Sequence, residues 1–246
     1  MKGKIVRLQR LFQEDHRSVV VALDHAQFQG AIPGLESMQS IVRDVVAGHA
    51  DGVILNPGAA TDCAMIYGGR CALIVRVTGA STSYNPSFDY HQQICSIERA
   101  VALGADAVIA MGFVGSDGES ASLALLSRIA EDCHRFGLPL IAEMLPVAEN
   151  RFQDPEWIGL AARVGYELGA DIIKAYTTGS EADEAVIAHC LLPFLAAGGP
   201  KSSNPAEIAS KAIAHGASGV AFGRNVFGGD SPQQVVEELV RAVHGA

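Results

Sequence analysis

One lysine stands at the end of an apolar run, in the segment Asp171 to Ala175 (DIIKA). The chain has only five lysines among its 246 residues, and lysine is rarely buried without a reason. At the end of a buried strand, Ile172 and its neighbours would disfavour the ammonium form of Lys174 and lower its pKa. The neutral amine can attack a carbonyl carbon and form a Schiff base. The alternative is a lysine that extends to solvent or pairs with a carboxylate.

An acid and an imidazole, Asp24 and His25, follow another apolar run. Adjacent strand residues point to opposite faces, so only one of the two faces the centre unless the strand has already ended. Asp24 could transfer protons or hold a substrate hydroxyl, with His25 as a second polar contact. In the alternative interpretation, Asp24 caps a neighbouring loop and His25 is a structural imidazole.

A second carboxylate, Glu143, lies inside the apolar run Pro139 to Met144 (PLIAEM) and needs a partner there. Lys174 and Arg76 are the candidate partners. The pattern fits a structural ion pair as well as general acid or base chemistry. Tyr176 also lies near a strand end and could reach the same place.

Two glycine-containing turns follow the last two apolar runs. The first is Gly198-Gly199-Pro200-Lys201, and the second begins with Gly223-Arg224. Glycines let backbone N–H groups approach an anion, and the loops after strands seven and eight commonly bind phosphate in (β/α)₈ barrels. Lys201 and Arg224 would add positive charge. These residues predict a phosphate site, which makes a phosphorylated small molecule the expected substrate.

The sequence does not indicate a metal or redox site. Of the eight histidines only His25 ends a strand, and neither HxH nor HExxH spacing occurs. The five cysteines are widely spaced without a CxxC pair, so we expect them to be reduced and packed. We therefore expect no metal and no cofactor.

Eight short apolar runs, separated by stretches with helical periodicity, predict an α/β protein with a (β/α)₈ TIM-barrel fold. Most runs lack polar alternation, as in parallel strands buried on both faces. No GxGxxG motif opens the first βα turn, which argues against an open dinucleotide-binding sheet. We expect one domain over residues 1–246. The runs are Ser18–Leu23, Gly52–Leu55, Ala72–Val77, Asp106–Met111, Pro139–Met144, Asp171–Ala175, Pro193–Ala197 and Gly219–Phe222.

Several of the intervening stretches end in a recurring G-A-D pattern just before the next apolar run, as at residues 104–106 and 169–171. The glycine predicts a helix C-cap and the following residues a strand start. The helices expected between the strands are Leu35–Gly48, Ala59–Tyr67, His91–Leu103, Glu119–Phe136, Pro155–Leu168, Ser180–His189, Pro205–His215 and Pro232–His244.

Composition excludes several classes of protein. The formal net charge is −9, which argues against a generic nucleic-acid binder or a polybasic membrane-surface protein. No apolar run approaches the roughly 18 residues of a membrane span. The basic first residues are interrupted by polar ones before a signal-peptide core develops, so we expect a cytoplasmic protein without nucleic-acid or membrane partners.

Four segments together resemble the DeoC/FbaB-type class I aldolase family, the barrel enzymes called archaeal-type fructose-bisphosphate aldolases, which include the DhnA-like proteins. They are ALDH at residues 22–25, GADIIK at 169–174, AGGPK at 197–201 and GASGVAFGRNVF at 216–227. The resemblance covers nearly the whole chain.

The resemblance implies that Lys174 is the Schiff-base lysine and that Asp24 and His25 line the substrate site. It implies that Gly198, Gly199, Gly223 and Arg224 surround a phosphate; it also implies an aldehyde-lyase that needs no metal and a homo-oligomer, often a decamer. In such a mechanism a protonated imine acts as the electron sink for carbon–carbon bond formation or cleavage.

One departure concerns the proton-transfer group. The family usually has a tyrosine before the proline of a YPRG motif, and this chain has Leu145 before Pro146. Glu143 lies two residues earlier on the same strand face and could replace the tyrosine. Asp24, His25 and Tyr176 are the other candidates.

Two other functions stay open at this stage. A thiolase that acts on a phosphorylated autoinducer-2-type dione belongs to the same barrel group, lacks that tyrosine and is similar in the segment ARVGYELGADIIKAY. Alternatively, the chain is a non-catalytic phosphosugar-binding module. The retained Lys174 argues against a pure binding module, and the missing tyrosine argues for it.

Overall fold

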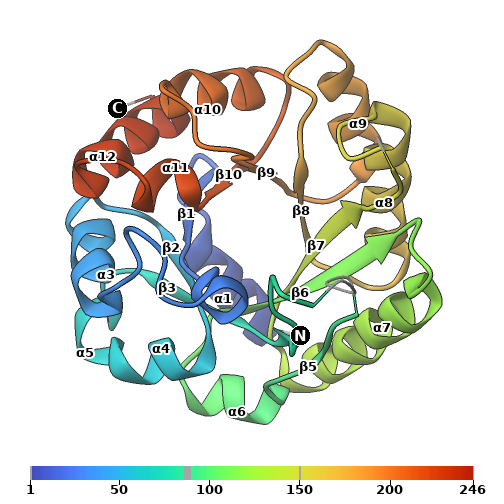
Figure 1. The fold of residues 1–246 in the computed structure, drawn as a ribbon, viewed down its shortest axis with the longest axis horizontal. Helices are drawn as coiled ribbons and strands as arrows, with labels where there is room; N and C mark the ends of the chain where they lie inside the picture. Colours follow the sequence, from blue (N-terminus) through green and yellow to red (C-terminus); the bar gives the residue numbers. More distant parts are fainter. Residues whose placement is uncertain (1, 86–89, 150, 246) are drawn as a thin grey trace.

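The computed structural model describes residues 2–85, 90–149 and 151–245, and Figure 1 shows a barrel surrounded by helices. Within the described chain, eight parallel strands close in the order β1-β10-β9-β8-β7-β6-β3-β2. Each apolar run predicted from the sequence overlaps one of these strands, so the predicted TIM barrel is confirmed. The strands are β1 (Ser18–Ala22), β2 (Gly52–Leu55), β3 (Ala72–Arg76), β6 (Ala107–Val114), β7 (Leu140–Pro146), β8 (Ile172–Tyr176), β9 (Phe194–Ala197) and β10 (Gly219–Phe222).

The outer helices follow the predicted ones closely. Two of them, α7 (Glu119–Phe136) and α12 (Pro232–His244), have the predicted bounds. None of the helices in the described ranges is long and apolar enough to cross a membrane. The other outer helices are α3 (Met38–Ala47), α4 (Pro57–Asp62), α5 (Ala64–Tyr67), α6 (Ile97–Ala102), α8 (Pro155–Glu167), α9 (Ala182–Cys190) and α10 (Pro205–Ala214).

Two predicted helices differ from the structure. The helix predicted over Ala59–Tyr67 is interrupted at Cys63, which separates α4 from α5. The helix predicted from His91 begins only at Ile97, because the Ser96 hydroxyl accepts the N–H of Arg99 and caps α6. The residues before this cap include β5 (Gln92–Gln93), which pairs with β4 (Thr78–Gly79).

Three helices were not predicted: α1 (Lys2–Leu11), α2 (Ala26–Gln29) and α11 (Arg224–Phe227). The first crosses the N-terminal end of the barrel, where Leu11 packs against the apolar side chains inside it. The other two begin just after β1 and β10, at the opposite end of the barrel. The strands are buried on both faces, because apolar side chains pack inside the barrel and between strands and helices.

The G-A-D pattern marks helix ends and strand starts, as predicted. Gly104 and Gly169 have φ values of 84° and 93°, which suit glycine at a helix C-terminus. The aspartates of the strand starts, Asp51, Asp106 and Asp171, each accept an N–H from a neighbouring strand, at 2.6, 3.2 and 2.9 Å respectively. These bonds fix the strands at the N-terminal end of the barrel.

Candidate active site

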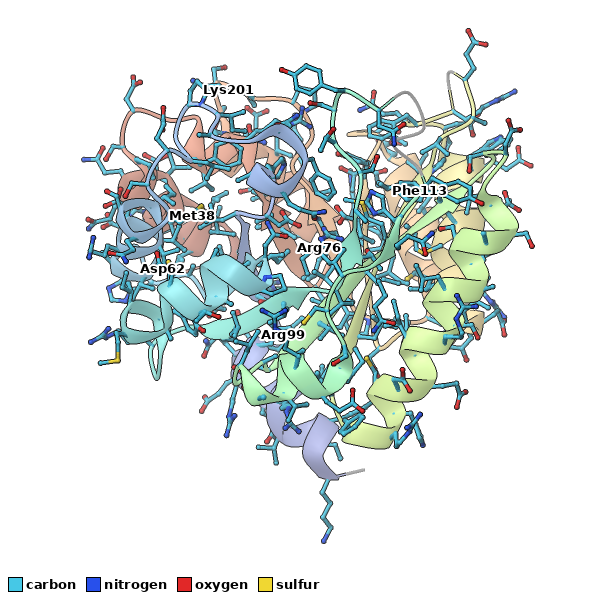
Figure 2. All side chains as sticks on the ribbon, turned by 60° about the horizontal axis from the view of Figure 1, so that its bottom comes forward. Met38, Asp62, Arg76, Arg99, Phe113 and Lys201 are labelled. Carbon is cyan, nitrogen blue, oxygen red and sulfur yellow. The ribbon has the colours of Figure 1, made fainter. Side chains whose placement is uncertain are left out.

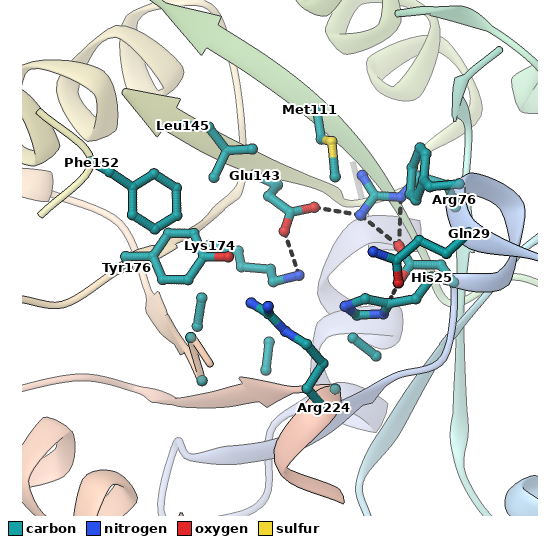
Figure 3. Close-up of a pocket in the computed structure, with 18 of the residues that line it drawn as sticks. His25, Gln29, Arg76, Met111, Glu143, Leu145, Phe152, Lys174, Tyr176 and Arg224 are labelled. Carbon is teal, nitrogen blue, oxygen red and sulfur yellow. Dashed lines mark hydrogen bonds and ion pairs between the residues drawn. The ribbon is translucent and has the colours of Figure 1, made fainter. Parts of the chain in front are cut away.

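A cavity of about 320 Å³ opens at the carboxyl ends of the strands, where (β/α)₈ barrels carry their active sites. Figure 3 shows charged side chains in its centre. The predicted site residues that line it come from five strands, β1, β7, β8, β9 and β10, and the segments that follow them. They are Asp24, His25, Glu143, Lys174, Tyr176, Gly198, Gly199, Gly223 and Arg224.

Lys174 faces a carboxylate inside the barrel. Its Nζ lies 2.6 Å from Oε1 of Glu143, and each residue is about 5–6% exposed. The two are register partners on the neighbouring parallel strands β7 and β8, so their side chains point to the same side of the sheet. Lys174 is therefore buried as predicted, but it is paired with Glu143 and does not lie among apolar groups alone.

Arg76 connects this pair to Asp24. It ends β3 and is fully buried, and its Nε and Nη2 lie 2.7 and 2.6 Å from Oδ2 of Asp24. The same Nη2 donates to Oε2 of Glu143. Both partners that the sequence offered for Glu143 are thus in contact with it. Four charged side chains, Asp24, Arg76, Glu143 and Lys174, form a continuous buried chain that we call the charge network (Figure 3).

The network keeps its carboxylates ionised. Burial alone would raise the pKa of Asp24, but the Arg76 guanidinium and the His25 ring outweigh burial and hold the pKa well below the ordinary value. For Glu143 burial also acts upward, while Lys174 and then Arg76 lower the pKa by more. Burial opposes the charge of Arg76, yet the two carboxylates raise its pKa above the ordinary value.

Asp24 and His25 both face the cavity, because β1 ends at Ala22 and the alternation of a strand no longer applies. Nδ1 of His25 lies 3.5 Å from Oδ1 of Asp24. The imidazole packs edge-on against Phe227, with ring centroids 5.1 Å apart. A Cβ at Gly223 would lie 2.5 Å from Cε1 of His25, so the close approach of the loop after β10 requires glycine there.

The two predicted phosphate loops are joined by a side chain that sequence reasoning did not assign. Nδ2 of Asn225 donates to the Gly198 carbonyl at 2.7 Å, and its Oδ1 accepts the N–H of Ser202 at 2.7 Å. Gly198, Gly199 and Gly223 line the cavity beside Arg224. A neutral amide thus sets the distance between the loops and leaves the Arg224 guanidinium as their cation.

Lys201 does not line the cavity with the other predicted residues. It is exposed, and Figure 2 shows it on the outer rim, whereas Arg76 lies inside the barrel. The chain turns outward because Gly199 adopts a φ of 66° and Ser202 is held by Asn225.

Several apolar residues also line the cavity, and of these the sequence analysis singled out only Leu145, as the residue in place of the family tyrosine. They come from β6, from β7 and from the segments that follow β1 and β7, and they meet at the cavity because closure of the barrel brings these segments together. Tyr176 packs against this group, and its ring centroid lies 4.2 Å from that of Phe152. Burial and Glu143 raise the pKa of Tyr176, although Arg224 opposes them. The apolar residues are Phe28, Met111, Phe113, Leu145, Val147 and Phe152.

In the described part of the chain, no group of three His, Cys, Asp or Glu side chains is arranged to hold a metal ion. The polar groups that converge on the cavity are the charge network, His25, Tyr176 and Arg224. An amine, a carboxylate beside it and a nearby cation are the groups needed for imine chemistry on an anionic carbonyl compound.

A parallel barrel with an amine and a carboxylate at its strand ends defines a scaffold for carbonyl chemistry. The model of the DeoC/LacD aldolase family matches residues 18–229. The chain belongs to this family and is an aldolase, an enzyme of the aldehyde-lyase type that makes or breaks a carbon–carbon bond. The resemblance found in the sequence is confirmed.

Two curated relatives are synthases. The chain is 37% identical over 247 residues to 2-amino-3,7-dideoxy-D-threo-hept-6-ulosonate synthase 1 of Archaeoglobus fulgidus, covering all of this chain and 92% of that protein. It is 33% identical to 2-amino-4,5-dihydroxy-6-oxo-7-(phosphonooxy)heptanoate synthase of Streptomyces griseus, covering 99% of this chain and 91% of that protein.

Two solved structures with the same fold are archaeal fructose 1,6-bisphosphate aldolases. An archaeal fructose 1,6-bisphosphate aldolase superposes with a TM-score of 0.90 at 29% identity, covering 99% of this chain and 100% of the other. An archaeal fructose-1,6-bisphosphate aldolase whose catalytic lysine carries the carbinolamine intermediate of the substrate has a TM-score of 0.90 at 28% identity, covering 98% and 100%. The fold and the aldolase activity thus go together in these neighbours.

Proposed function

We propose that the chain is a class I aldolase in which Lys174 forms a Schiff base with the ketone of a phosphorylated donor. The contact between Lys174 Nζ and Glu143 Oε1, 2.6 Å long and buried at the barrel mouth, is the observation that carries this proposal. A lysine held in this way lies where a carbonyl carbon can reach it, beside a group that can take up its proton.

The reaction begins when Glu143 takes a proton from the Lys174 ammonium and the neutral amine adds to the ketone; Glu143 then returns that proton as water leaves, which forms a protonated imine. The imine withdraws electrons from the neighbouring carbon, which loses a proton and becomes part of an enamine. That carbon bonds to the carbonyl carbon of an aldehyde, whose oxygen takes up a proton. Water then hydrolyses the imine, releasing the product and restoring the amine, and cleavage is the reverse sequence.

Glu143 is the proposed proton carrier at the imine. It contacts the reacting nitrogen directly, whereas Asp24 contacts Arg76 and His25. A carboxylate whose pKa lies below its ordinary value accepts a proton from Lys174 only transiently, which suits a group that must give the proton back. Tyr176 and His25 line the same cavity and are the candidates for protonating the aldehyde oxygen.

The relatives indicate the donor. In the product named for the Streptomyces griseus relative, an aldol bond would join the carbon beside the ketone to the next hydroxyl-bearing carbon. Breaking that bond leaves dihydroxyacetone phosphate as the ketone half. The same phosphorylated ketone is half of fructose 1,6-bisphosphate, the substrate in the names of the structural neighbours. We therefore take dihydroxyacetone phosphate as the donor, with its phosphate at Arg224 and the glycine loops.

Borohydride trapping tests the proposal. The protein is incubated with dihydroxyacetone phosphate, reduced, and read by intact mass and peptide mapping. We expect a stable adduct on Lys174 that is absent from Lys174→Met and present in Lys201→Met, because Lys201 is an exposed lysine outside the cavity. No adduct, together with a melting shift on adding the phosphate ester, would instead support the thiolase or the binding-module function.

Location and assembly follow from the same proposal. We propose a cytoplasmic, metal-independent homo-oligomer, as the resemblance to the aldolase family implies. Size-exclusion chromatography with light scattering measures the assembly, and a mass near 25.8 kDa would contradict it.

A further inference from the structure

The cavity has two halves of different chemistry, on opposite sides of Lys174. The glycine loops and Arg224 follow β9 and β10, which lie across the closed barrel from β3 and β6. Facing them are the apolar residues of β6, β7 and the segment after β1. Figure 3 shows Met111, Leu145 and Phe152 on one side of the Lys174 amine and Arg224 on the other.

The apolar half carries no charge of its own in the described chain. Its other lining residues there are Gln29 and Ser83, which are neutral. Arg151 precedes Phe152 in the sequence, but its charge is paired elsewhere. Its Nη1 lies 2.6 Å from Oδ2 of Asp154, and its Cζ lies 5.8 Å from the centroid of the Trp157 ring. The charged groups beside the apolar half belong to the charge network, in which Nε and Nη2 of Arg76 contact the carboxylates of Asp24 and Glu143.

Donor orientation decides which half receives the aldehyde, and this step rests on the proposed function. In dihydroxyacetone phosphate the carbon that becomes nucleophilic lies on the far side of the ketone from the phosphate. With the phosphate at Arg224 and the ketone carbon on Lys174, the new bond forms toward Met111, Phe113 and Leu145. The body of the aldehyde must then lie against these side chains.

We propose that the acceptor is a neutral aldehyde with an apolar body, aromatic or branched aliphatic. Such a body removes apolar surface from water on binding, whereas a phosphate or a zwitterionic amino acid would lose water without gaining a partner. The rings of Phe152 and Tyr176, tilted by 47° with centroids 4.2 Å apart, add aromatic surface that an apolar body can contact. The cavity, at about 320 Å³, is at the small end of ligand pockets, which run from about 300 to 1,000 Å³.

An acceptor panel tests this inference. With dihydroxyacetone phosphate as donor, kcat/KM is measured for benzaldehyde, isobutyraldehyde, glyceraldehyde 3-phosphate and 2-amino-4-oxobutanoate. We expect at least one of the two apolar aldehydes to exceed both charged ones by about tenfold or more, the discrimination that apolar contacts provide. Equal or better turnover of either charged aldehyde would overturn the inference, as would turnover of no apolar aldehyde.

A charge placed on the apolar half sharpens the test. Leu145→Arg should lower kcat/KM for the preferred apolar aldehyde and raise the relative value for glyceraldehyde 3-phosphate, shifting the ratio by about tenfold or more. Leu160→Arg is the matched control, since Leu160 is 52% exposed on α8 outside the cavity, and it should leave the ratio unchanged. An unchanged ratio in Leu145→Arg would contradict the inference.

Trapping with the donor alone separates the two proposals. An adduct on Lys174 in the wild type and in Leu145→Arg shows that the amine is in place, so a preference for charged aldehydes then counts against the apolar acceptor only. If the wild type forms no adduct, the proposed function fails and the acceptor inference fails with it.

Discussion

Both ends of the barrel hold carboxylates, half-buried at the N-terminal end and buried at the C-terminal end, and the two ends satisfy them differently. At the N-terminal end, Asp106 and Asp171 each accept an N–H from a neighbouring strand. Each also forms an ion pair with a residue of α1, Asp106 with Arg10 and Asp171 with Lys4. At the C-terminal end, the recorded bonds of the Asp24 and Glu143 carboxylates, in the described chain, are to side chains. A carboxylate bound to backbone fixes the fold, whereas one bound to an amine can exchange a proton with it.

Loss of the amine should have the largest effect of any change at either end. Lys174→Met should reduce aldol activity about 10⁴-fold or more, because it removes the amine that forms the covalent bond to the donor. Cleavage or synthesis assays measure this loss, and circular dichroism checks that the fold is kept. Near-normal activity in Lys174→Met would refute a Schiff-base mechanism at this residue.

Loss of the central guanidinium should be the largest effect on stability. Arg76→Met leaves Asp24 and Glu143 buried without their shared cation, which should lower the free energy of unfolding by about 3–5 kcal/mol. Arg10→Met, at the other end, removes a cation that is 62% exposed and should cost about 1 kcal/mol or less. Urea unfolding measures both values, and equal losses would contradict the contrast between the two ends.

Removal of the phosphate cation should affect binding more than chemistry. Arg224→Ala should raise KM for the phosphorylated donor about tenfold to a hundredfold, since a hydrogen bond to a charged group contributes about 1.5–3 kcal/mol. We expect kcat to change little, because Arg224 is not part of the charge network. Steady-state kinetics with Lys201→Ala as the control separates the two quantities, and a fall in kcat alone would place Arg224 in the chemical step.

A fall in pH should have the smallest of these effects, a gradual loss of the contribution that Asp24 makes to the free energy of unfolding. The folded-state pKa of Asp24 is below its ordinary value of 3.8, so its contribution to stability is complete above that value and is lost as the pH falls further. The slope from one such group is at most about 1.4 kcal/mol per pH unit. Urea unfolding between pH 6 and pH 3 should therefore give a shallower acid slope in Asp24→Asn than in the wild type. Identical slopes would contradict the lowered pKa.

Much of the fold could be predicted because its signals are local. The strands read as apolar runs between glycine-terminated helices, and α7 and α12 carry clear helical periodicity. Helix α1 could not be predicted in this way, because its position depends on Asp106 and Asp171, which lie far away in the sequence. The break at Cys63 and the late start of α6 have a different cause, since they depend on local turns and on the Ser96 cap, which apolar periodicity does not report.

The candidate site could be predicted only in part. Lys174, Glu143 and Asp24 were identified because charged residues in or beside apolar runs need partners, and all three line the cavity. Arg76 was considered only as a partner of Glu143, although it joins both carboxylates. The expected place of Lys201 beside the phosphate loops is not observed, since a turn at Gly199 carries it outward.

The sequence by itself determined the barrel, the lysine and the glycine loops, because each depends on residue type and on spacing along one segment. Only the tertiary structure decided which of these groups meet. Closure of the barrel makes β7 and β8 neighbours, which pairs Glu143 with Lys174, and it sets the apolar residues of β6 opposite Arg224. The nature of the acceptor half follows from that closure, since its side chains come from segments that share no signal in the sequence.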